Sequence, residues 1–183
     1  MCLSQGAQAA NFEIGRIDLD RQESGVYLST DLNFELSNVL QDALLKGITL
    51  HFVTEVDISE SRWYFYDKQV AHAARYVRMF YMPLTRKWRV HVSPEPFSNN
   101  GLGVSLGQSY DTAEEAANAV KHIAKWRIGN NGDINFDGKQ KLNFSFKLDA
   151  NQLPRPLQFG IVGQSDWNIS LSKSIKLTAE QVQ

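Results

Sequence analysis

The stretch ITLHFVTEVDI, residues 48–58, decides the fold class of this chain. Apolar side chains share one parity, at Ile48, Leu50, Phe52, Val56 and Ile58, and polar side chains take the other, at Thr49, His51, Glu55 and Asp57. Successive side chains of a β-strand point to opposite faces. The pattern therefore predicts a strand with one buried face and one face toward solvent.

The same period of two recurs along the chain, in residues 26–34, 141–148 and 167–177. Around Gly15 the apolar parity slips by one position, which is typical of a β-bulge in an edge strand. Residues 69–92 predict a long hairpin, because Pro83 presets the backbone for a turn that extends to Arg86.

Two segments carry helical patterns. Ser37 can cap a helix that ends at Gly47 and has an apolar side at Leu40, Ala43 and Leu44. Thr112 and Glu115 have the spacing of a capping box, ahead of an apolar stripe at Ala116, Val120, Ile123 and Ala124. Each stripe is narrow, which favours helices packed over a sheet.

The expected fold is mainly β: an antiparallel β-sandwich, with an immunoglobulin-like arrangement as one form of it, and two short accessory helices. A length of 183 residues suits one domain, placed at 11–178. Residues 1–10 are interpreted as a signal-peptide remnant or a disordered N-terminus, and residues 179–183 as a disordered tail.

Composition excludes several classes of function. Lys and Arg number 19 against 20 for Asp and Glu, so there is no excess positive charge to hold nucleic acid. Cys2 is the only cysteine, which rules out an internal disulfide and a thiolate metal cluster. No apolar run is long enough for a transmembrane segment.

The N-terminus contains a pattern that is typical of secretory signal peptides. Ala7-Gln8-Ala9 followed by Ala10 fits the A-x-A pattern at a signal-peptidase site, although no apolar stretch precedes it. We interpret it as the end of a secretory signal and expect a periplasmic or secreted protein. A disordered terminus rich in Ala and Gln is the alternative.

The sequence contains no motif for catalysis. The histidines lie in no HExxH, HxH or CxxH arrangement, at His51, His72, His91 and His122, and there is no GxSxG elbow. We therefore expect no enzymatic activity, no cofactor and no catalytic residues.

One local motif points toward a metal. Asp133, Asn135, Asp137 and Gly138 match the first half of an EF-hand calcium loop. The twelfth position is Phe144 where a carboxylate should close the cage, and a strand pattern follows where a helix is expected. A turn stabilised by Asx side chains is the favoured alternative, and calcium binding stays open.

Aromatic and arginine side chains are interleaved between residues 62 and 90, and we take as candidate binding residues Trp63, Tyr64, Tyr66, Arg75, Arg78 and Arg86. Flat rings and forked donors suit a platform for a peptide or for sugars. The alternative, favoured on general grounds, is that the rings are core residues and that arginine stems cover apolar surface.

The runs Arg62–Val92, Thr112–Ile128 and Leu148–Ser170 resemble the bacterial family catalogued as domain of unknown function 4390. Its most specific parts are LTR-x-W-R-V at residues 84–90, LPRPLQ at 153–158 and DWN at 166–168. The likeness covers nearly all of the chain after residue 11, but Ser172-Lys173-Ser174 stand where another Trp is expected. The resemblance implies a secreted envelope protein of unknown activity, encoded near an envelope sensor kinase, and it supplies no catalytic residues.

These observations lead to the hypothesis of a periplasmic binding or interaction module, linked to envelope signalling, whose partner is an envelope protein or peptide. The loop Pro154-Arg155-Pro156 adds Arg155 to the candidate binding residues. One alternative is a carbohydrate or small-ligand domain, which requires a pocket that holds the rings beside carboxylates such as Asp67. A further alternative is a hydrolase with a dispersed site, which requires two groups with displaced pKa values in one cleft.

Overall fold

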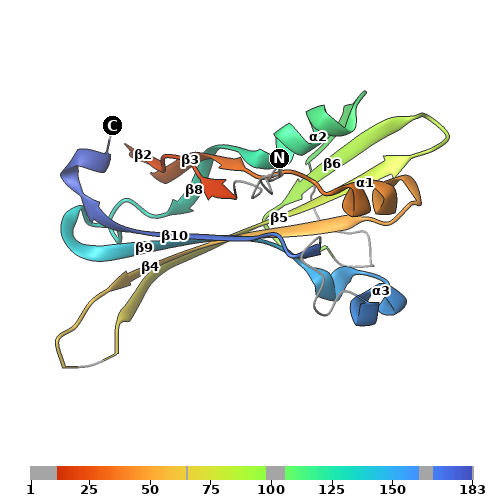
Figure 1. The fold of residues 1–183 in the computed structure, drawn as a ribbon. Coiled ribbons are helices and arrows are strands. Elements are labelled where there is room, and N and C mark those ends of the chain that lie inside the picture. Colours follow the sequence, from red (N-terminus) through yellow and green to blue (C-terminus); the bar gives the residue numbers. More distant parts are fainter. Residues whose placement is uncertain (1–11, 65, 98–105, 161–166, 183) are drawn as a thin grey trace, which may run out of the picture.

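Two antiparallel sheets pack face to face in the computed structural model, which describes residues 12–64, 66–97, 106–160 and 167–182 (Figure 1). The larger sheet has six strands in the order β10-β9-β4-β5-β6-β7. Its strands are β4 (Leu50–Glu60), β5 (Lys68–Met82), β6 (Lys87–Ser93), β7 (Leu106–Tyr110), β9 (Asp137–Leu148) and β10 (Ser170–Thr178). In the smaller sheet β3 (Gly25–Asn33) pairs with β8 (His122–Gly129), β1 (Glu13–Ile14) and β2 (Asp18–Gln22).

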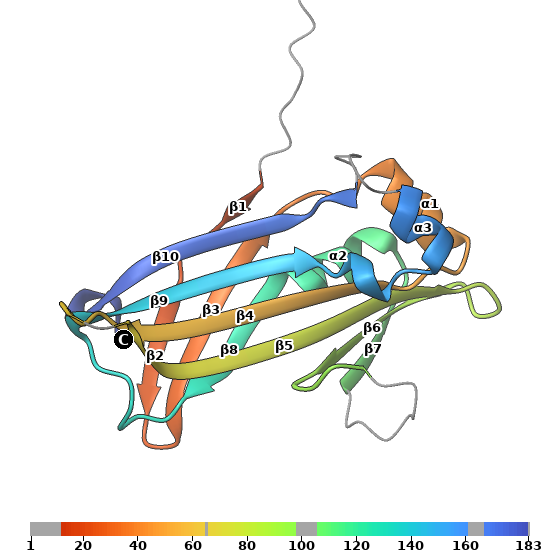
Figure 2. The same ribbon diagram turned by 90° about the horizontal axis from the view of Figure 1, so that it is seen from below.

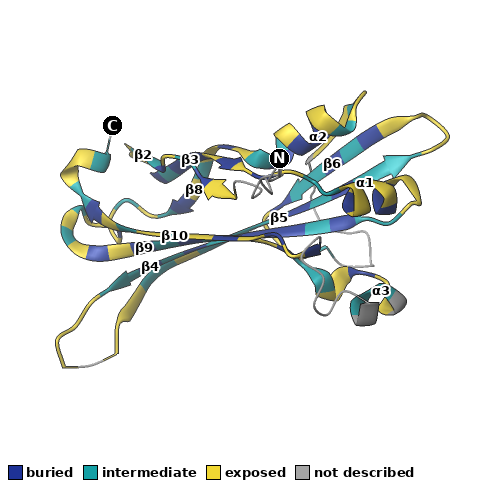
Figure 3. Ribbon diagram, viewed as in Figure 1, coloured by how far each residue is buried: buried dark blue, intermediate teal, exposed yellow. Residues whose placement is uncertain are grey.

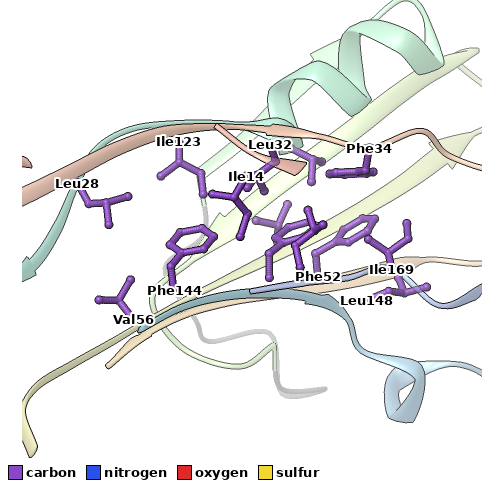
Figure 4. Close-up of a cluster of buried hydrophobic side chains, with 14 of the residues drawn as sticks. Ile14, Leu28, Leu32, Phe34, Phe52, Val56, Ile123, Phe144, Leu148 and Ile169 are labelled. Carbon is purple, nitrogen blue, oxygen red and sulfur yellow. The ribbon is translucent and has the colours of Figure 1, made fainter. Parts of the chain in front are cut away.

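The hydrophobic core lies between the two sheets, where the alternating apolar side chains of both meet (Figure 4). The ring of Phe146 on β9 stacks on two other rings. Its centroid lies 5.2 Å from that of Phe34 and 5.5 Å from that of Phe52 on β4. Burial of each such ring contributes roughly 1.5–3 kcal/mol to folding. The predicted mainly β, sandwich-like class is confirmed, whereas an immunoglobulin-like arrangement is not.

The predicted bulge near the N-terminus is confirmed. Ile14 pairs with Leu32 but Asp18 pairs with Ser29, so the register shifts by one residue between β1 and β2. At the shift, the Gly15 N–H donates a hydrogen bond of 2.8 Å to the carbonyl oxygen of Asp31 on the facing strand β3. A Cβ on Gly15 would lie 2.9 Å from that oxygen, which explains why glycine occupies the bulge.

The helix predicted after Ser37 is present as α1 (Asn38–Leu45). The Ser37 Oγ atom accepts a hydrogen bond of 3.3 Å from the Leu40 N–H, and Gly47 follows the helix at a φ of 85°. Its three predicted core residues are buried.

The second helix, α2 (Ala113–Lys121), is shorter than predicted. Thr112 caps it as expected, but Ile123 and Ala124 belong to strand β8, so their assignment to the helix was wrong. Pairing with β3 satisfies the backbone of this segment, and a buried Ile123 fits either pattern. Tertiary contacts therefore override the helical period here.

Two other segments differ from the prediction. Pro154-Arg155-Pro156, expected as a loop, opens the short helix α3 (Arg155–Gly160). Residues 179–182, suggested as part of a disordered tail, form a 3₁₀ turn (Ala179–Gln181), and Val182 bridges to Leu19 of β2. The predicted signal remnant at 1–10 lies outside the described residues.

The predicted long hairpin is confirmed as β5 and β6, and residues 83–86 form its turn. Arg86 adopts a positive φ of 51° in this turn. From two perpendicular directions, α1 and α3 lie near this end of the molecule, and the connection between β4 and β5 lies at the opposite end (Figures 1 and 2).

Candidate functional site

The connection between β4 and β5 presents the aromatic side chains to solvent. Trp63, Tyr64 and Tyr66 are 92%, 67% and 97% exposed, and we call these three residues the aromatic tip. The Trp63 and Tyr64 rings meet edge to face at 4.6 Å. The interpretation of these rings as core residues is therefore wrong.

The strand register explains why the aromatic tip projects. The last pair of the β4–β5 ladder joins Glu60 to Lys68, and the Ser61 N–H reaches the Lys139 carbonyl oxygen at 3.5 Å. Beyond this point the chain leaves the sheet and forms the exposed end visible in yellow (Figure 3). The rings are thus held on a hairpin whose base is well paired.

The arginines predicted to accompany these rings lie elsewhere. Strand β5 is 15 residues long, so its two ends are about 45–50 Å apart, with the aromatic tip before it and Arg86 after it. Arg75 and Arg78 have opposite parity and point to opposite faces of the sheet. Arg155 begins α3, at the end of the molecule away from the aromatic tip (Figure 2). The structure does not gather the candidate residues into one site.

Arg78 belongs to the outer face of the larger sheet. Its guanidinium lies 4.7 Å from the centroid of the Phe97 ring, and its Nη2 atom is 3.2 Å from Nδ1 of His91. A cavity of about 210 Å³ opens beside it, lined in part by His51 and Asp149. Burial and the neighbouring Arg78 lower the pKa of His51, against the opposing effect of Asp149.

Arg75 belongs to the inner face and lines a larger cavity of about 470 Å³, which we call the Arg75 cavity. Its other polar lining residues are Gln108 and Tyr110 of β7 and His122 of β8. Its apolar lining comes from β6, α2 and β8, at Val90, Val92, Ala119 and Ala124.

The cavity forms where the chain passes from one sheet to the other. Strands β7 and β8 are edge strands of the two sheets, and α2 connects them while it contacts β6 and β7. Within the described residues no strand pairing joins β7 to β8, and the small side chains of Ala119 on α2 and Ala124 on β8 line the space between them. Figure 1 shows α2 lying over the β5–β6 hairpin.

The guanidinium of Arg75 lacks part of its expected pairing. The Nη1 atom is buried and has no hydrogen-bond partner within the described part of the chain. Thr54, directly across the ladder on β4, also has a buried side-chain oxygen without a partner among those residues. Burial lowers the pKa of Arg75 to about 10, so the side chain is still a cation at neutral pH.

The mouth of the cavity holds two polar pairs. The His122 Nδ1 atom lies 2.6 Å from an Asp31 carboxylate oxygen, and both side chains are exposed. The Tyr110 hydroxyl donates to the Gln108 side-chain oxygen, and burial raises the pKa of Tyr110. Arg75 itself forms no ion pair with a carboxylate among the described residues.

Two displaced pKa values in one cleft were the condition for the hydrolase alternative, and Arg75 and Tyr110 meet it formally. Both groups nevertheless keep their ordinary protonation state at neutral pH, because one is a strong base and the other a weak acid. Neither can exchange a proton readily near pH 7, so the pair offers no general acid or base.

The calcium-like segment is organised by its own side chains. Gln140 is buried, accepts a hydrogen bond from the Asn135 N–H at 2.9 Å and donates one to the Asp133 carbonyl oxygen at 3.1 Å. The Lys139 N–H donates to Asp137, which lowers the pKa of that carboxyl. No three acidic, histidine or cysteine side chains converge in the described ranges, and Phe144 is in the core. The geometry supports the turn alternative.

The fold and its cavities define a two-sheet β domain with an inter-sheet cavity. The family model for a domain of unknown function, DUF4390, matches residues 9–177, and the chain belongs to this family. No curated protein and no solved structure matches the chain. Among the described residues, no helix has the length and apolar character needed to cross a membrane.

The Arg75 cavity was not predicted as a site, although Arg75 was a candidate residue. The sequence feature that could have predicted this site is the position of Arg75 in the strand. Arg75 points to the same face of β5 as Ala73, Val77 and Met79, which line the inner face. A cation at a core-facing position is unusual enough to mark a site. The residues of β7 and α2 that complete the cavity carry no such signal.

Proposed function

We propose that this domain is a binding module of the bacterial envelope, periplasmic or secreted, that docks a protein partner through the aromatic tip. The exposure of Trp63, Tyr64 and Tyr66 carries the proposal. The location rests on the A-x-A pattern at Ala7–Ala9 and on the envelope character that the family resemblance implies. The link to envelope signalling rests on that resemblance alone.

The chemistry of the tip suits a protein interface. Tryptophan, tyrosine and arginine dominate the few residues that supply most binding energy at such interfaces. Arg62 is exposed next to Trp63, and Asp67 and Lys68 are exposed on the other side of the tip. Rings at the centre and mixed charges around them follow the usual order of an apolar core within a polar rim.

The size of the tip is adequate. A buried aromatic side chain contributes roughly 150–250 Å², so three rings offer roughly 450–750 Å². One side of a standard interface buries about 800 Å². A partner that covers the rings and the flanking charged residues would reach that size.

The test is a double substitution, Trp63→Ala with Tyr66→Ala. Because both side chains are exposed, the melting temperature should change by no more than about 2 °C. Capture of the partner from an envelope fraction, quantified by mass spectrometry, should fall at least about tenfold, as expected for residues of this kind.

The matched control is Leu84→Ala. Leu84 is 98% exposed at the turn between β5 and β6, so it is an equally exposed apolar residue at the other end of β5. This variant should retain the partner. Equal loss in both variants, full retention in the double variant, or a large fall in its melting temperature would each contradict the proposal.

A lipid surface is the competing occupant for exposed Trp and Tyr rings. Vesicles of phosphatidylethanolamine and phosphatidylglycerol should leave the tryptophan emission unchanged if the partner is a protein. A blue shift that vanishes in Trp63→Phe would show that the tip inserts into lipid and would overturn the proposal.

A further inference from the structure

The Arg75 cavity combines an open volume with a half-buried cation whose Nη1 atom is buried and which has no carboxylate partner among the described residues. Its volume of about 470 Å³ falls within the range of roughly 300–1,000 Å³ typical of small-molecule sites. Val90 is fully buried in its floor, whereas Gln108, His122 and Ala124 are exposed and form its mouth. Arg75 reaches it from the middle of the largest strand.

An unpaired guanidinium in this position is costly to the fold. Buried charges in proteins are normally paired, because desolvation disfavours an isolated ion. Arg75 has a buried Nη1 atom without a partner among the described residues, and no described acidic side chain forms an ion pair with it. The lowered pKa of Arg75 agrees with a cation whose lost hydration is not replaced.

We infer that the Arg75 cavity binds a small amphipathic carboxylate, such as a fatty acid, with its head group on Arg75 and its apolar body against Val90, Val92 and Ala119. The cavity volume, the unpartnered Nη1 atom and the apolar wall together carry this inference.

The Arg75 guanidinium and the apolar wall of the cavity together determine which class of ligand fits. The planar fork of a guanidinium matches the two oxygens of a carboxylate and forms paired, charge-assisted hydrogen bonds with it. The walls on β6 and α2 are aliphatic, so they favour a hydrocarbon body over a polar one. Because Arg75 is less exposed than Gln108, His122 and Ala124 at the mouth, we expect the carboxylate to lie deeper in the cavity than the end of the hydrocarbon chain.

The charges at the mouth do not oppose this arrangement. Asp31 is the acidic group near His122, and its carboxylate is engaged by the Nδ1 atom of that histidine at 2.6 Å. Gln108 and Tyr110 are held to each other and are uncharged at neutral pH. Arg75 thus remains the cation available to an incoming oxyanion within the lining of this cavity.

This inference does not depend on the aromatic tip. The two sites share no residue, and the tip lies before β5 whereas the cavity is lined by the inner face of β5, β6 and β7. Failure of one proposal therefore leaves the other intact.

The experiment is titration calorimetry and thermal shift with decanoate, with decan-1-ol as the neutral molecule of the same chain length and acetate as the head group alone. Wild-type protein should bind decanoate at least about tenfold more tightly than decanol, since hydrogen bonds to charged groups are the stronger ones. Acetate should bind weakly. Equal binding of decanoate and decanol, equal binding of acetate, or no binding of decanoate would overturn the inference.

Arg75→Met tests the cation while it keeps the length of the side chain. Decanoate binding should fall at least about tenfold, decanol binding should not, and the melting temperature of the ligand-free protein should rise because an unpaired charge is removed. Arg86→Met, at the exposed β5–β6 turn, is the matched control and should change nothing.

A second variant covers the case in which Arg75→Met fails to fold. Ala119→Phe on α2 fills the cavity and leaves Arg75 in place. This variant should lose both decanoate and decanol while it still melts cooperatively. Unchanged decanoate affinity in a folded Ala119→Phe or Arg75→Met protein would show that the ligand lies elsewhere.

Discussion

At the scale of single residues, Lys173 shows how one side chain joins the two sheets. It belongs to β10 of the larger sheet, and its Nζ atom donates hydrogen bonds to the carbonyl oxygens of Ile14 at 3.2 Å and Gly15 at 2.8 Å. These oxygens lie at the bulge of the smaller sheet, where the ladder is interrupted and leaves backbone acceptors free. The Lys173 ammonium group therefore donates hydrogen bonds to the backbone carbonyl oxygens that the bulge leaves free.

Replacement of this side chain by an apolar one should destabilise the protein. Lys173→Met removes two charge-assisted hydrogen bonds, for an expected loss of about 1.5–3 kcal/mol in the free energy of unfolding, measured by urea denaturation. Lys176→Met, an exposed position on the same strand, should lose less than about 0.5 kcal/mol. Equal losses would mean that the bonds of Lys173 contribute nothing specific.

Two histidines should make stability depend on pH. Burial, followed by the charge of Arg78, lowers the pKa of His51, and burial, Arg78 and Arg89 lower that of His91. The unfolded chain takes up these protons near pH 6.5, before the folded protein does. Stability is thus fully present above pH 6.5 and decreases as the pH falls from there toward the lower pKa values of the folded state.

Thermal melts between pH 7.5 and 5 test this linkage. The melting temperature of the wild type should fall across this window, and His51→Asn, which cannot be protonated, should reduce the slope. His72→Asn, at an exposed position on β5, serves as the comparison. A slope that His51→Asn leaves unchanged would remove His51 from the linkage.

At the scale of elements, α2 depends on its first turn. The Thr112 Oγ1 atom accepts a hydrogen bond of 3.1 Å from the Glu115 N–H, and the Glu115 carboxylate accepts one of 3.1 Å from the Asp111 N–H. This cap fixes the start of the helix that separates β7 from β8. Loss of the cap should therefore loosen one wall of the Arg75 cavity.

Thr112→Ala is the corresponding variant. Removal of such a cap costs about 1 kcal/mol, which corresponds to about 2–4 °C in the melting temperature of a chain of this size. Hydrogen exchange should quicken in α2 and stay unchanged in α1, which has its own cap at Ser37. Thr85→Ala in the exposed β5–β6 turn is the control. Uniform loss of protection would indicate global unfolding in place of a local effect.

At the scale of the whole molecule, the alternation of apolar and polar residues predicted the strands that show it, and it missed elements that depend on contacts remote in the sequence. Most of the strands, the bulge at Gly15 and the hairpin through Pro83 follow from local patterns of apolar residues and turn formers, and the structure confirms them, whereas β7 was not predicted. Strand β8 was missed because its backbone partner, β3, is remote in the chain, and α3 was missed because Pro154 and Pro156 suggested a loop.

The candidate site was predicted in composition but not in arrangement. Side-chain type identified Trp63, Tyr66 and Arg75, yet proximity in sequence placed them together, whereas the length and alternation of β5 separate them. The cavity itself depends on how β7, α2 and β8 meet across the seam between sheets, which no local pattern contains. The exposure of the rings likewise depends on where the ladder of β4 and β5 ends.

The pairing of the strands has a consequence for the order in which the chain can fold. Val26 of β3 meets Gly129 of β8, and Phe52 of β4 meets Leu148 of β9, so each sheet joins an early segment to one synthesised much later. Such remote contacts must overcome the entropy of closing long loops before they add stability. The hairpin of β5 and β6 can form as soon as it is made, but neither sheet is complete until its last strand has left the ribosome. The smaller sheet can therefore be complete once β8 has emerged, whereas the larger sheet and the core between the two sheets must wait for β9 and β10.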